Sequence, residues 1–536
     1  MKHKVSITII AIFVIVAVAT AALYITKKDV KIFQRKTSQS YEKSAIVSLP
    51  MLKVKTLNPL NSVDKDTYYI SKLIFESLFS LDENLTAQPE LVSACNFDRV
   101  SKELSITIRR DAYFSNGEPL TAADVKFSID SLKAAPKTLY AKYVSSIRAV
   151  SVDKNDDYSL IIKYSDLNNS ALENLIFPIV SQKQFAEVAK SSKQWENGAV
   201  PIGSGAYKIA SYNDITEMEL EANEYYQGEK PTNKLRFTVL FSEEDTIPML
   251  DVSTISLGIS ESMSIDTLIA DKNIKLKTFC SPDAEVLGFN FKSKFMENKN
   301  FRKAVAHCVD VDEINTDIYY GNGIESDSIY FPNYLGVKNE GDRYKYSKQK
   351  AKRFLSKTPF TDLNKDGILD VSDKEAVNIK ILVNKKHSEK VLTAEKIAEG
   401  LAGVGVNTTL IFAENDADFA QKIATGNFDL FVATFHFNET YDLRNLLHSG
   451  YGNAIGYKNT KLDELLDKLK SGLSKEDETQ AYGKIKKLIG DELPYYCILY
   501  KTYGAMLSEN IKGVNSVYFN NFYKDAPNWY CEYEVH

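Results

Sequence analysis

The chain has 536 residues, a length that exceeds one hydrophobic core and predicts two or three domains. Its composition is that of an ordinary soluble protein, with 44% hydrophobic and 26% charged residues. The 66 basic and 71 acidic residues give a net charge of −5, so the chain does not have the excess of basic residues that is typical of nucleic-acid-binding proteins. The five cysteines include no CxxC pair, so the sequence does not indicate a zinc site.

The N-terminus carries an apolar segment that predicts export. Residues 5–25 are uncharged and apolar, and as a helix they would span about 30 Å, enough for the core of a bilayer. We expect residues 1–25 to be an uncleaved membrane anchor. The alternative is a cleaved signal peptide, because Ala17, Ala19 and Ala21 have the spacing of a cleavage site. Residues 26–44 are basic and polar and predict a tether, so both interpretations place the rest of the chain outside the cytoplasm.

The first folded elements are a mixture of strands and helices. Residues 45–49 and 104–108 predict strands, and residues 67–78 carry apolar side chains at helical spacing. The sequence TAAD at residues 121–124 has the pattern of a capping box and predicts the start of a helix. The sequence PIGSGAY at residues 201–207 predicts a turn leading into strands, one of them at residues 216–222. This turn lacks both GxGxxG and GxxxxGK, so it does not predict a phosphate-binding loop.

An acidic loop at residues 362–373 has the ligand spacing of an EF-hand-like calcium site. Oxygen ligands stand at positions one, three, five, seven, nine and twelve around Gly367. They are Asp362, Asn364, Asp366, the backbone carbonyl of Ile368, Asp370 and Asp373. The aspartate at position twelve is shorter than the usual bidentate glutamate. The pattern predicts a structural Ca²⁺ ion, with a solvated acidic turn as the alternative, and we expect no other cofactor.

Three apolar runs separated by two helices predict a parallel sheet near the end of the chain. The predicted strands are residues 379–383, 406–412 and 430–435, and the predicted helices are residues 392–401 and 416–425. This order implies parallel pairing with right-handed crossovers. Ligands bind at the carboxyl ends of strands in open sheets of this kind. Phe435, His436 and Asn438 therefore become candidate ligand-binding residues.

Each of these candidates has a simpler structural interpretation. Phe435 fits the core, where most strand aromatics are buried. Asn438 and Asp442 fit a loop turn. His436 fits either a structural or exposed position or a contact to a metal chelate. Only the location at the carboxyl end of a strand favours the binding role.

Several sequence blocks occur in the order found in one known family. They are LNP at 57–59, FESL at 75–78, FSNGEPLTAADV at 114–125, GSGAY at 203–207, NEYY at 223–226, FN at 289–290 and FRKA at 301–304, followed by Pro494 and Gly513. With these blocks the chain resembles the extracellular solute-binding proteins of family 5, which supply oligopeptides, dipeptides or nickel chelates to ABC transporters. The resemblance covers about residues 57–529.

The resemblance implies an α/β fold of two lobes, the type II periplasmic-binding-protein fold with a subdomain inserted in the first lobe. Lobe I would comprise residues 45–81, 202–279 and 492–536, the inserted subdomain residues 82–201, and lobe II residues 280–491. We expect a monomer that closes about a hinge on a peptide and is then recognised by the permease of an ABC importer. Unlike lipid-anchored members, this chain has no cysteine before Cys95, so its apolar segment would be the anchor.

The resemblance also implies a ligand site. In peptide-binding members the strand matching residues 430–435 is followed by Trp-x-x-Asp, whose carboxylate pairs with the amino terminus of the peptide. Phe435 and Asn438 stand at these two positions, so the charge-assisted bond becomes an ordinary one unless Glu439 or Asp442 supplies the charge.

The opposite wall of this implied site resembles a peptide-pairing strand near Val63 and Lys65, with Tyr140 reaching in from the inserted subdomain. Backbone pairing of this kind accepts any side chain.

Two alternatives remain. The change to Asn438 fits a binding protein of the same fold for a non-peptide solute, such as a metal chelate or a sugar, or a sensor of a signalling peptide. An exported hydrolase is the other class, but the sequence contains neither HExxH nor GxSxG. We therefore predict a binding protein and not an enzyme.

Overall fold

The computed structural model describes residues 41–165, 171–188, 200–270, 272–470 and 473–534. The predicted anchor at residues 1–25 lies outside these ranges. Within them, no helix combines the length and the apolarity that crossing a bilayer requires. Residues 41–44, the end of the predicted tether, form β1 (Tyr41–Ser44), which pairs with β22 (Tyr530–Glu534), so the tether prediction is wrong for these four residues.

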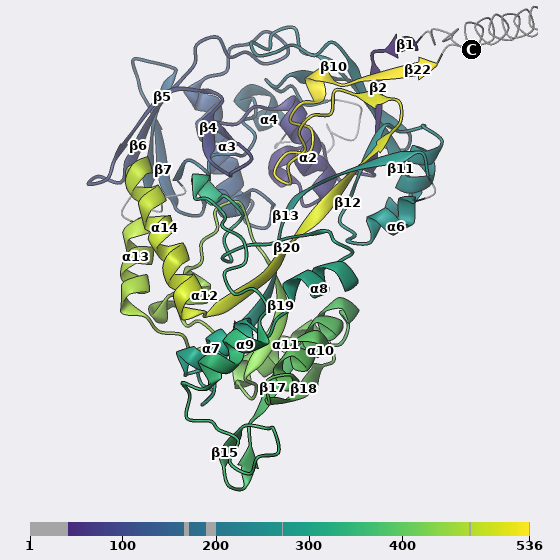
Figure 1. Ribbon diagram of the computed structural model, residues 1–536. Helices are drawn as coiled ribbons and strands as arrows, with labels where there is room; N and C mark the ends of the chain where they lie inside the picture. The colour runs from purple at the N-terminus through teal and green to yellow at the C-terminus, as the bar shows by residue number, and fades with distance from the viewer. Residues whose placement is uncertain (1–40, 166–170, 189–199, 271, 471–472, 535–536) are drawn as a thin grey trace, which may run out of the picture.

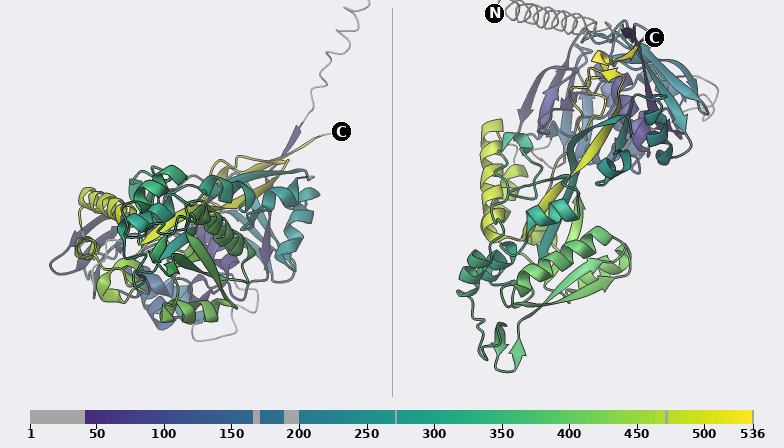
Figure 2. Two further views of the ribbon diagram at one scale, coloured as in Figure 1. Left: turned by 60° about the horizontal axis from the view of Figure 1, so that its bottom comes forward. Right: turned by 45° about the vertical axis from the view of Figure 1, so that its right-hand side comes forward.

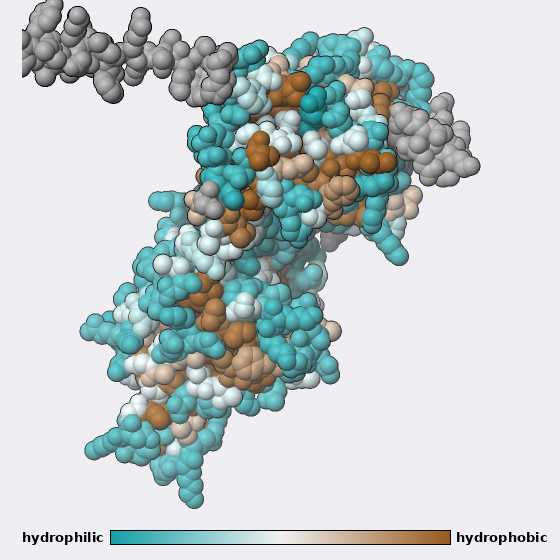
Figure 3. All heavy atoms as spheres, turned by 90° about the vertical axis from the view of Figure 1, so that its right-hand side faces the viewer, coloured by the Kyte–Doolittle hydropathy of each residue, from teal (hydrophilic) through white to brown (hydrophobic). Residues whose placement is uncertain are grey.

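The molecule consists of two lobes joined by a waist (Figures 1 and 2). The space-filling view of Figure 3 shows the same two masses of atoms, with polar residues over most of this face and apolar residues in separate patches. The predicted α/β fold of two lobes is confirmed, since helices and sheets alternate in both.

The first lobe is built on a four-stranded sheet in the order β2-β11-β10-β9. Its strands are β2 (Ile46–Leu52), β11 (Lys234–Leu240), β10 (Glu217–Ala222) and β9 (Tyr207–Asn213). Alternate residues of β2 are buried, namely Val47, Leu49 and Met51, because side chains of a strand point to opposite faces in turn. The sequence had predicted β2 and β10. A second sheet of this lobe joins β1, β22 and β21 (Ile511–Lys512).

Helix α2 (Lys65–Ile74) contacts β9 and ends four residues earlier than predicted. The cause is the glycine turn at residues 203–205. The backbone N–H of Gly205 donates to the carbonyl of Ile74 at 2.8 Å, and a Cβ atom on Gly203 would lie 1.9 Å from that oxygen. The turn therefore satisfies a carbonyl that the end of the helix leaves without an intrahelical partner, and only glycine fits so close to it.

The inserted subdomain has an antiparallel sheet in the order β5-β6-β8-β7. Its strands are β5 (Val92–Asp98), β6 (Glu103–Ile108), β8 (Ser159–Tyr164) and β7 (Ile147–Val152), and its helices are α3 (Ala122–Ala134) and α4 (Gln182–Val188). Thr121 and Asp124 form the predicted capping box at the start of α3. The short hairpin of β3 (Phe79–Leu81) and β4 (Ala87–Pro89) precedes this sheet in the chain.

A seven-stranded sheet runs through both lobes (Figure 1). Its main order is β12-β20-β13-β19-β17-β18, with β14 (Gly323–Ile324) beside β20. The strands are β12 (Leu257–Ser260), β20 (Tyr495–Ser508), β13 (Ile274–Phe289), β19 (Leu430–His436), β17 (Asn378–Asn384) and β18 (Asn407–Ala413). Two small helices, α5 (Thr246–Asp251) and α6 (Ile265–Ile269), pack near β12 through a separate apolar cluster.

The long strands β13 and β20 change register at the waist. Cys280 pairs with Thr502 and Ala284 with Tyr500, so the β13 residues between them face the single residue Lys501. Such a bulge bends the strand and increases its local twist. The part of β13 before the bulge belongs to the first lobe, and the part after it pairs with β19 of the second lobe.

The second lobe contains the parallel unit that the sequence predicts. β17 pairs in parallel with both β18 and β19. Helix α10 (Ser388–Ala402) covers one face, where Ile397 and Ile381 share one apolar core. Helix α11 (Asp416–Thr425) covers the other face, where the rings of Phe419 and Phe431 are 6.2 Å apart. Both faces are thus buried, as the short apolar runs indicated.

The remaining helices flank this sheet. They are α7 (Lys299–Ala306), α8 (Val311–Asp317), α9 (Lys348–Leu355), α12 (Arg444–Leu447), α13 (Thr460–Lys470) and α14 (Lys475–Glu492). A hairpin of β15 (Asp370–Ser372) and β16 (Glu375–Ala376) forms the far tip of the lobe (Figure 1).

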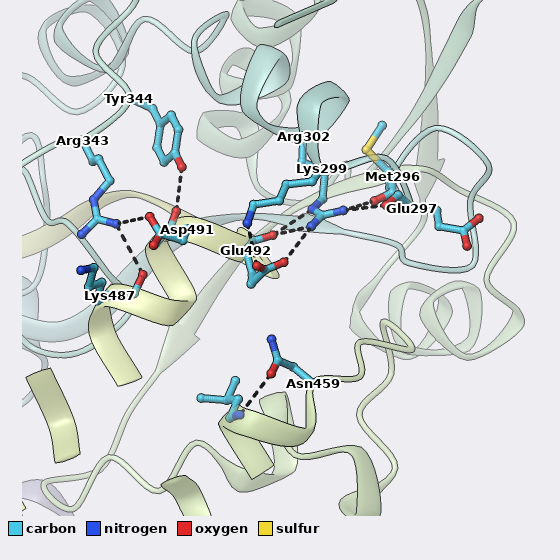
Figure 4. Close-up of polar contacts among 12 residues, drawn as sticks. Met296, Glu297, Lys299, Arg302, Arg343, Tyr344, Asn459, Lys487, Asp491 and Glu492 are labelled. Atoms are coloured by element: carbon cyan, nitrogen blue, oxygen red, sulfur yellow. Dashed lines mark hydrogen bonds and ion pairs between the residues drawn. The ribbon is translucent and has the colours of Figure 1, made fainter. Parts of the chain in front are cut away.

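Arg302 fixes the point where α14 ends and β20 begins (Figure 4). Its Nε and Nη2 atoms donate to the carbonyl of Glu492 at 2.9 and 2.6 Å, and Nη1 donates to the carbonyls of Met296 and Glu297. Burial lowers the pKa of Arg302 to about 10. The FRKA block of the sequence therefore contains a structural arginine that satisfies the end of a helix.

Candidate ligand-binding site

A cavity of about 430 Å³ lies between the lobes, and we call it the larger chamber. The first lobe and the inserted subdomain contribute side chains from α2, from the 3-10 helix η2 (Ala141–Val144) and from the strand end at Glu261. The second lobe contributes the loop after β19. The lining residues are Lys65, Tyr68, Tyr69, Leu139, Lys142, Tyr143, Glu261, Pro282, Asp283, His436, Phe437, Asn438, Glu439, Tyr503 and Phe519.

Glu439 joins the two sides of this chamber. The residue is only 7% exposed, and its carboxylate accepts hydrogen bonds from the hydroxyls of Tyr68, at 3.0 Å, and Tyr143. The ammonium of Lys142 lies 3.8 Å away. A buried carboxylate needs such donors, because its hydration is lost on burial. Glu439 belongs to the loop after β19, whereas Tyr68 belongs to α2 and Tyr143 to the inserted subdomain, so these bonds connect all three parts.

The charge of Glu439 is retained at neutral pH. Burial acts to raise the pKa of its carboxyl, but Lys142, the Tyr143 hydroxyl and Lys72 outweigh it, and the net shift is downward. Burial lowers the pKa of the Lys72 ammonium to about 8, against the opposing effect of Glu439 and Glu90. The larger chamber therefore has a stable negative charge in its wall.

Asp283 and His436 form a second charged group in the same chamber. The Nδ1 atom of His436 lies 2.7 Å from Oδ1 of Asp283, and the hydroxyl of Tyr503 donates to Oδ2 at 3.3 Å. The hydrogen bond with Asp283 is the main cause that raises the pKa of His436 above its ordinary value. The third carboxylate, that of Glu261, pairs with Lys65.

A smaller chamber of about 270 Å³ adjoins the larger one, and the two share Lys142, Tyr143 and Asn438. The rest of its wall comes from the inserted subdomain, from the segment after β19, from α13 and from buried tyrosines. These residues are Ser145, Ser146, Asn174, Tyr330, Thr440, Tyr441, Asp442, Leu443, Arg444, Leu466, Leu469, Lys470 and Tyr482. Asp442 is held by Arg444, whose Nε atom donates to Oδ1 at 2.8 Å and to Oδ2 at 3.0 Å.

Asn438 lies at the rim between the chambers and is oriented by its own loop. Its Oδ1 atom accepts hydrogen bonds from the backbone N–H of Thr440 at 3.1 Å and from the Thr440 hydroxyl at 2.8 Å. The backbone N–H can only donate, so it fixes which end of the amide is the oxygen. Asn438 therefore presents N–H donors to the chambers, while its acceptor serves the loop turn.

The predicted site residues are distributed unequally. His436, Asn438 and Lys65 line the larger chamber, and Asp442 lines the smaller one. Phe435 lines neither chamber and packs against Tyr495, with ring centroids 5.2 Å apart. The geometry therefore supports the interpretation of Phe435 as a residue of the hydrophobic core.

Two further predictions need correction. Lys65 is not part of a strand, because Asp64 caps the first turn of α2 by accepting from the N–H of Thr67 at 2.8 Å. Val63 is exposed but contacts neither chamber. Tyr140 is fully buried behind the wall, where its ring stacks on Tyr68 at 5.1 Å.

Sequence reasoning missed the residues that make the site polar. Tyr143 lies three positions after Tyr140, one turn of the 3-10 helix further, and it is the tyrosine that reaches the chamber. Tyr68 lies on a helix that the sequence predicted. Asp283 carried no signal, because it reaches the site only through the pairing of β13 with β19.

The predicted calcium loop runs into β15 at the far tip of the second lobe (Figure 1). Its side chains accept hydrogen bonds from the loop itself: Asp362 from the N–H of Gly367 at 3.0 Å, and Asp366 from that of Ile368 at 2.8 Å. In the described part of the chain, no group of three or more His, Cys, Asp or Glu side chains is placed to hold a metal ion. The Ca²⁺ ion stays a prediction.

Comparison with known proteins identifies the family. The model of bacterial extracellular solute-binding proteins, family 5 Middle, matches residues 86–457. The oligopeptide-binding protein AppA of Bacillus subtilis is 22% identical over 528 residues, which cover 96% of each chain. The nickel-binding protein NikA of Staphylococcus aureus is 22% identical over 448 residues, or 82% of this chain and 85% of that protein.

Solved structures share the fold. The unliganded open form of the murein tripeptide-binding protein MppA has a TM-score of 0.78 at 18% identity, covering 92% of this chain and 99% of MppA. B. subtilis AppA in complex with a nonapeptide has a TM-score of 0.58 at 21% identity, covering 92% of this chain and all of that one. Because the family model matches more than half of its length, the chain belongs to the family 5 bacterial extracellular solute-binding proteins.

Proposed function

We propose that the protein captures peptides between its lobes outside the cytoplasm and delivers them to an ABC importer. The observation that carries this proposal is a chamber walled by both lobes that holds the ionised carboxylate of Glu439, next to the position of the family's peptide-binding aspartate. Relatives over most of the chain are named oligopeptide-binding and dipeptide-binding proteins. Attachment through residues 1–25 and a monomeric state are part of the proposal.

Glu439 takes the role of the missing aspartate in this proposal. Asn438 offers donors to the chamber, so it cannot accept a hydrogen bond from an ammonium group in this orientation. Asp442 is occupied by Arg444. Glu439 keeps its charge, and its cationic neighbour Lys142 lies at 3.8 Å with a half-exposed side chain. The amino terminus of a peptide would replace Lys142 and form a charge-assisted bond.

The same residue connects ligand binding with closure. Glu439 contacts Tyr68 and Tyr143 across the chamber. Pro282 and Asp283 of the β13 bulge line the same chamber. We place the hinge at this bulge, next to the predicted lobe boundary at residues 279 and 280. A ligand that adds contacts to both walls favours the closed form by its difference in affinity for the two forms.

Mass spectrometry of ligand released from freshly purified, denatured protein tests the proposal. We expect a series of peptides, and a single non-peptide species would overturn it. The matched variants are Glu439→Gln and Glu261→Gln. We expect Glu439→Gln to weaken binding of free-amino peptides by about 10- to 100-fold, the value of a hydrogen bond to a charged group. N-acetylated peptides should bind the Glu439→Gln variant and the wild type alike, and Glu261→Gln should have a small effect.

A nickel chelate is the second candidate ligand, and His436 favours it. The imidazole is 71% exposed and its Nδ1 atom is engaged by Asp283, an arrangement that orients metal-binding histidines in other proteins. One relative is named a nickel-binding protein, and one solved structure of the same fold is a complex with Ni(L-His). Recovery of nickel with the released ligand, and its loss in a His436→Gln variant, would support this candidate.

A further inference from the structure

Helix α9 and the chain on either side of it carry a concentration of positive charge. Residues 343–361 include five lysines and two arginines but no aspartate or glutamate, and all of these cations are exposed. The chain as a whole has a net charge of −5, so this stretch is opposite in sign to the protein that carries it. The surface around α9 is therefore a place where anions are attracted.

Four cations gather around the half-buried ring of Phe354, and we call Lys303, Lys350, Arg353 and Lys357 the basic patch. The Nζ atoms of Lys303, from α7, and Lys357 lie 5.9 and 5.3 Å from the centre of that ring. Lys350 and Arg353 are three positions apart, so they lie on the same side of α9. The basic patch thus combines residues of two helices that pack together in the second lobe.

The basic patch has no counter-charge of its own. The neighbouring Lys299 and Arg343 pair with Glu492 and Asp491, whereas no cation of the basic patch forms an ion pair with a carboxylate in the described ranges. The pKa of the Lys303 ammonium is lowered, first by partial burial and then by the charge of Lys299. An anion can therefore approach the basic patch without displacing a carboxylate of the protein.

The charges of α9 do not serve the stability of the helix. Its first turn carries Lys348 and Lys350 and no acidic residue, although the positive end of the helix dipole favours carboxylates there. Lys348 and Lys352 are four positions apart, a spacing at which like charges repel. The helix is held instead by the Ser347 side chain, which accepts from the N–H of Lys350 at 3.3 Å, and by the burial of Leu355. Local stability therefore gives no reason for so many cations.

The proposed attachment of the chain keeps this charge near a membrane. Residues 26–40 span at most about 50 Å when fully extended, so residues 1–25 would hold the first lobe, where β1 begins, within that distance of the bilayer. Helix α9 lies in the second lobe, away from β1 (Figure 1). A second contact there would fix the orientation of both lobes, which a single attachment leaves free.

We propose that the basic patch docks on the anionic lipid surface of the membrane, so that the second lobe rests on the bilayer. Lipid phosphates supply the negative charge that the basic patch lacks, and clusters of basic residues bind such surfaces without a defined pocket. This inference rests on the part of the proposed function that attaches the chain through residues 1–25, and it is independent of peptide capture.

Lysine acetylation of the whole chain, read by mass spectrometry, tests the contact. The chain is mixed with excess vesicles of phosphatidylcholine alone or of phosphatidylcholine with phosphatidylglycerol. We expect Lys350 and Lys357 to react at least about fivefold more slowly on the vesicles with phosphatidylglycerol. This protection should be lost in about 1 M salt, where the Debye length is about 3 Å. Lys154 and Lys386, exposed lysines of the inserted subdomain and the second lobe, should react alike on both kinds of vesicle.

Lys350→Gln combined with Arg353→Gln removes half of the charge of the basic patch and leaves Lys357 as the reporter. Each basic residue near an anionic surface changes the docking equilibrium about fivefold, so we expect docking to weaken about 25-fold and most of the protection of Lys357 to disappear. Lys385→Gln with Lys386→Gln removes the same charge from exposed positions just after β17 and is the matched control. It should leave Lys357 protected.

Each outcome decides the proposal. Equal acetylation of Lys357 on the two kinds of vesicle, or protection that survives in the double variant of the basic patch, overturns the membrane contact. Protection by soluble polyphosphate with none by vesicles assigns the basic patch to a phosphate polymer and also overturns it. Retention of the chain on vesicles of phosphatidylcholine alone reports attachment through residues 1–25, so a failure of that part of the proposed function is seen separately.

Discussion

His436 and Asp283 face each other across the paired strands β19 and β13, with 2.7 Å between Nδ1 and Oδ1. Asp283 is the last residue of the bulge that interrupts β13, and His436 is the last residue of β19. The pair therefore connects the carboxyl end of a strand in the second lobe with the waist of the molecule.

This pair predicts a pH dependence of stability. The hydrogen bond and charge of Asp283, together with Glu261, raise the pKa of His436, while partial burial and Lys142 oppose this effect. Because the pKa of His436 is higher in the folded state than in the unfolded state, the pair stabilises the fold fully at pH values below the unfolded-state pKa. This stabilisation is lost as the pH rises through the folded-state pKa. Because the imidazole is mostly exposed, the contribution should be less than about 1 kcal/mol.

The measurement compares the free energy of unfolding of wild type and His436→Gln between about pH 5 and about pH 9, a range that brackets the ordinary histidine pKa. We expect the difference to be largest at acid pH and to vanish at alkaline pH, and Asp283→Asn should abolish it. A difference that grows with pH would contradict the pairing.

Lys501 and Glu285 form a buried ion pair at the same waist. Glu285 is fully buried, and its Oε1 atom lies 2.8 Å from the ammonium of Lys501 and accepts from the Thr434 hydroxyl at 2.6 Å. Lys501→Met would leave this carboxylate without its counter-charge. We expect this change to lower the free energy of unfolding, measured by urea denaturation, by about 3–5 kcal/mol. The double variant Glu285→Leu with Lys501→Met should recover most of this loss. If the single change costs less than about 1 kcal/mol, the pair is not the constraint described here.

The sequence predicted elements better than it predicted the site. The unit from β17 to β19 was recognisable because each short apolar run is buried on both faces, and α11 coincides with its predicted range. The site depends on pairs distant in sequence: 153 positions separate Asp283 from His436, and 371 separate Tyr68 from Glu439. Hydrophobic periodicity contains no information on such pairs, because register and lobe docking bring them together.

The end of α2 shows that hydrophobic periodicity also fails to predict where a single helix ends. The apolar spacing continues past Ile74, so the sequence predicted a longer helix. The helix stops because the glycine turn near Gly203 takes its last carbonyl, and that turn is more than a hundred positions away.

Calcium should stabilise the second lobe if the loop at residues 362–373 binds it. Stabilisation by a ligand grows with its concentration and reaches about 2.7 kcal/mol at one hundred times the dissociation constant. We expect the midpoint of thermal unfolding to be higher in Ca²⁺ than in EDTA, with little effect of Mg²⁺, which demands a tighter octahedral site. Asp362→Asn combined with Asp366→Asn should remove the response. Equal midpoints in Ca²⁺ and EDTA would leave the loop as a solvated acidic turn.

Asn438→Asp restores the carboxylate that peptide-binding members of the family have at this position. It separates the role of this residue in the loop turn from its role in ligand binding. Asp can accept both hydrogen bonds from Thr440 that Asn438 accepts now, so the free energy of unfolding should change by less than about 0.5 kcal/mol. The new charge beside Glu439 should strengthen binding of free-amino peptides by about 10-fold and leave N-acetylated peptides unaffected. Asn445→Asp, the same charge change on the exposed surface of α12, is the matched control. If Asn438→Asp weakens the binding of free-amino peptides while Asn445→Asp does not, the prediction is wrong. Repulsion between the carboxylates of residues 438 and 439 then outweighs the added attraction for the ammonium group, and Glu439 alone is sufficient to bind that group.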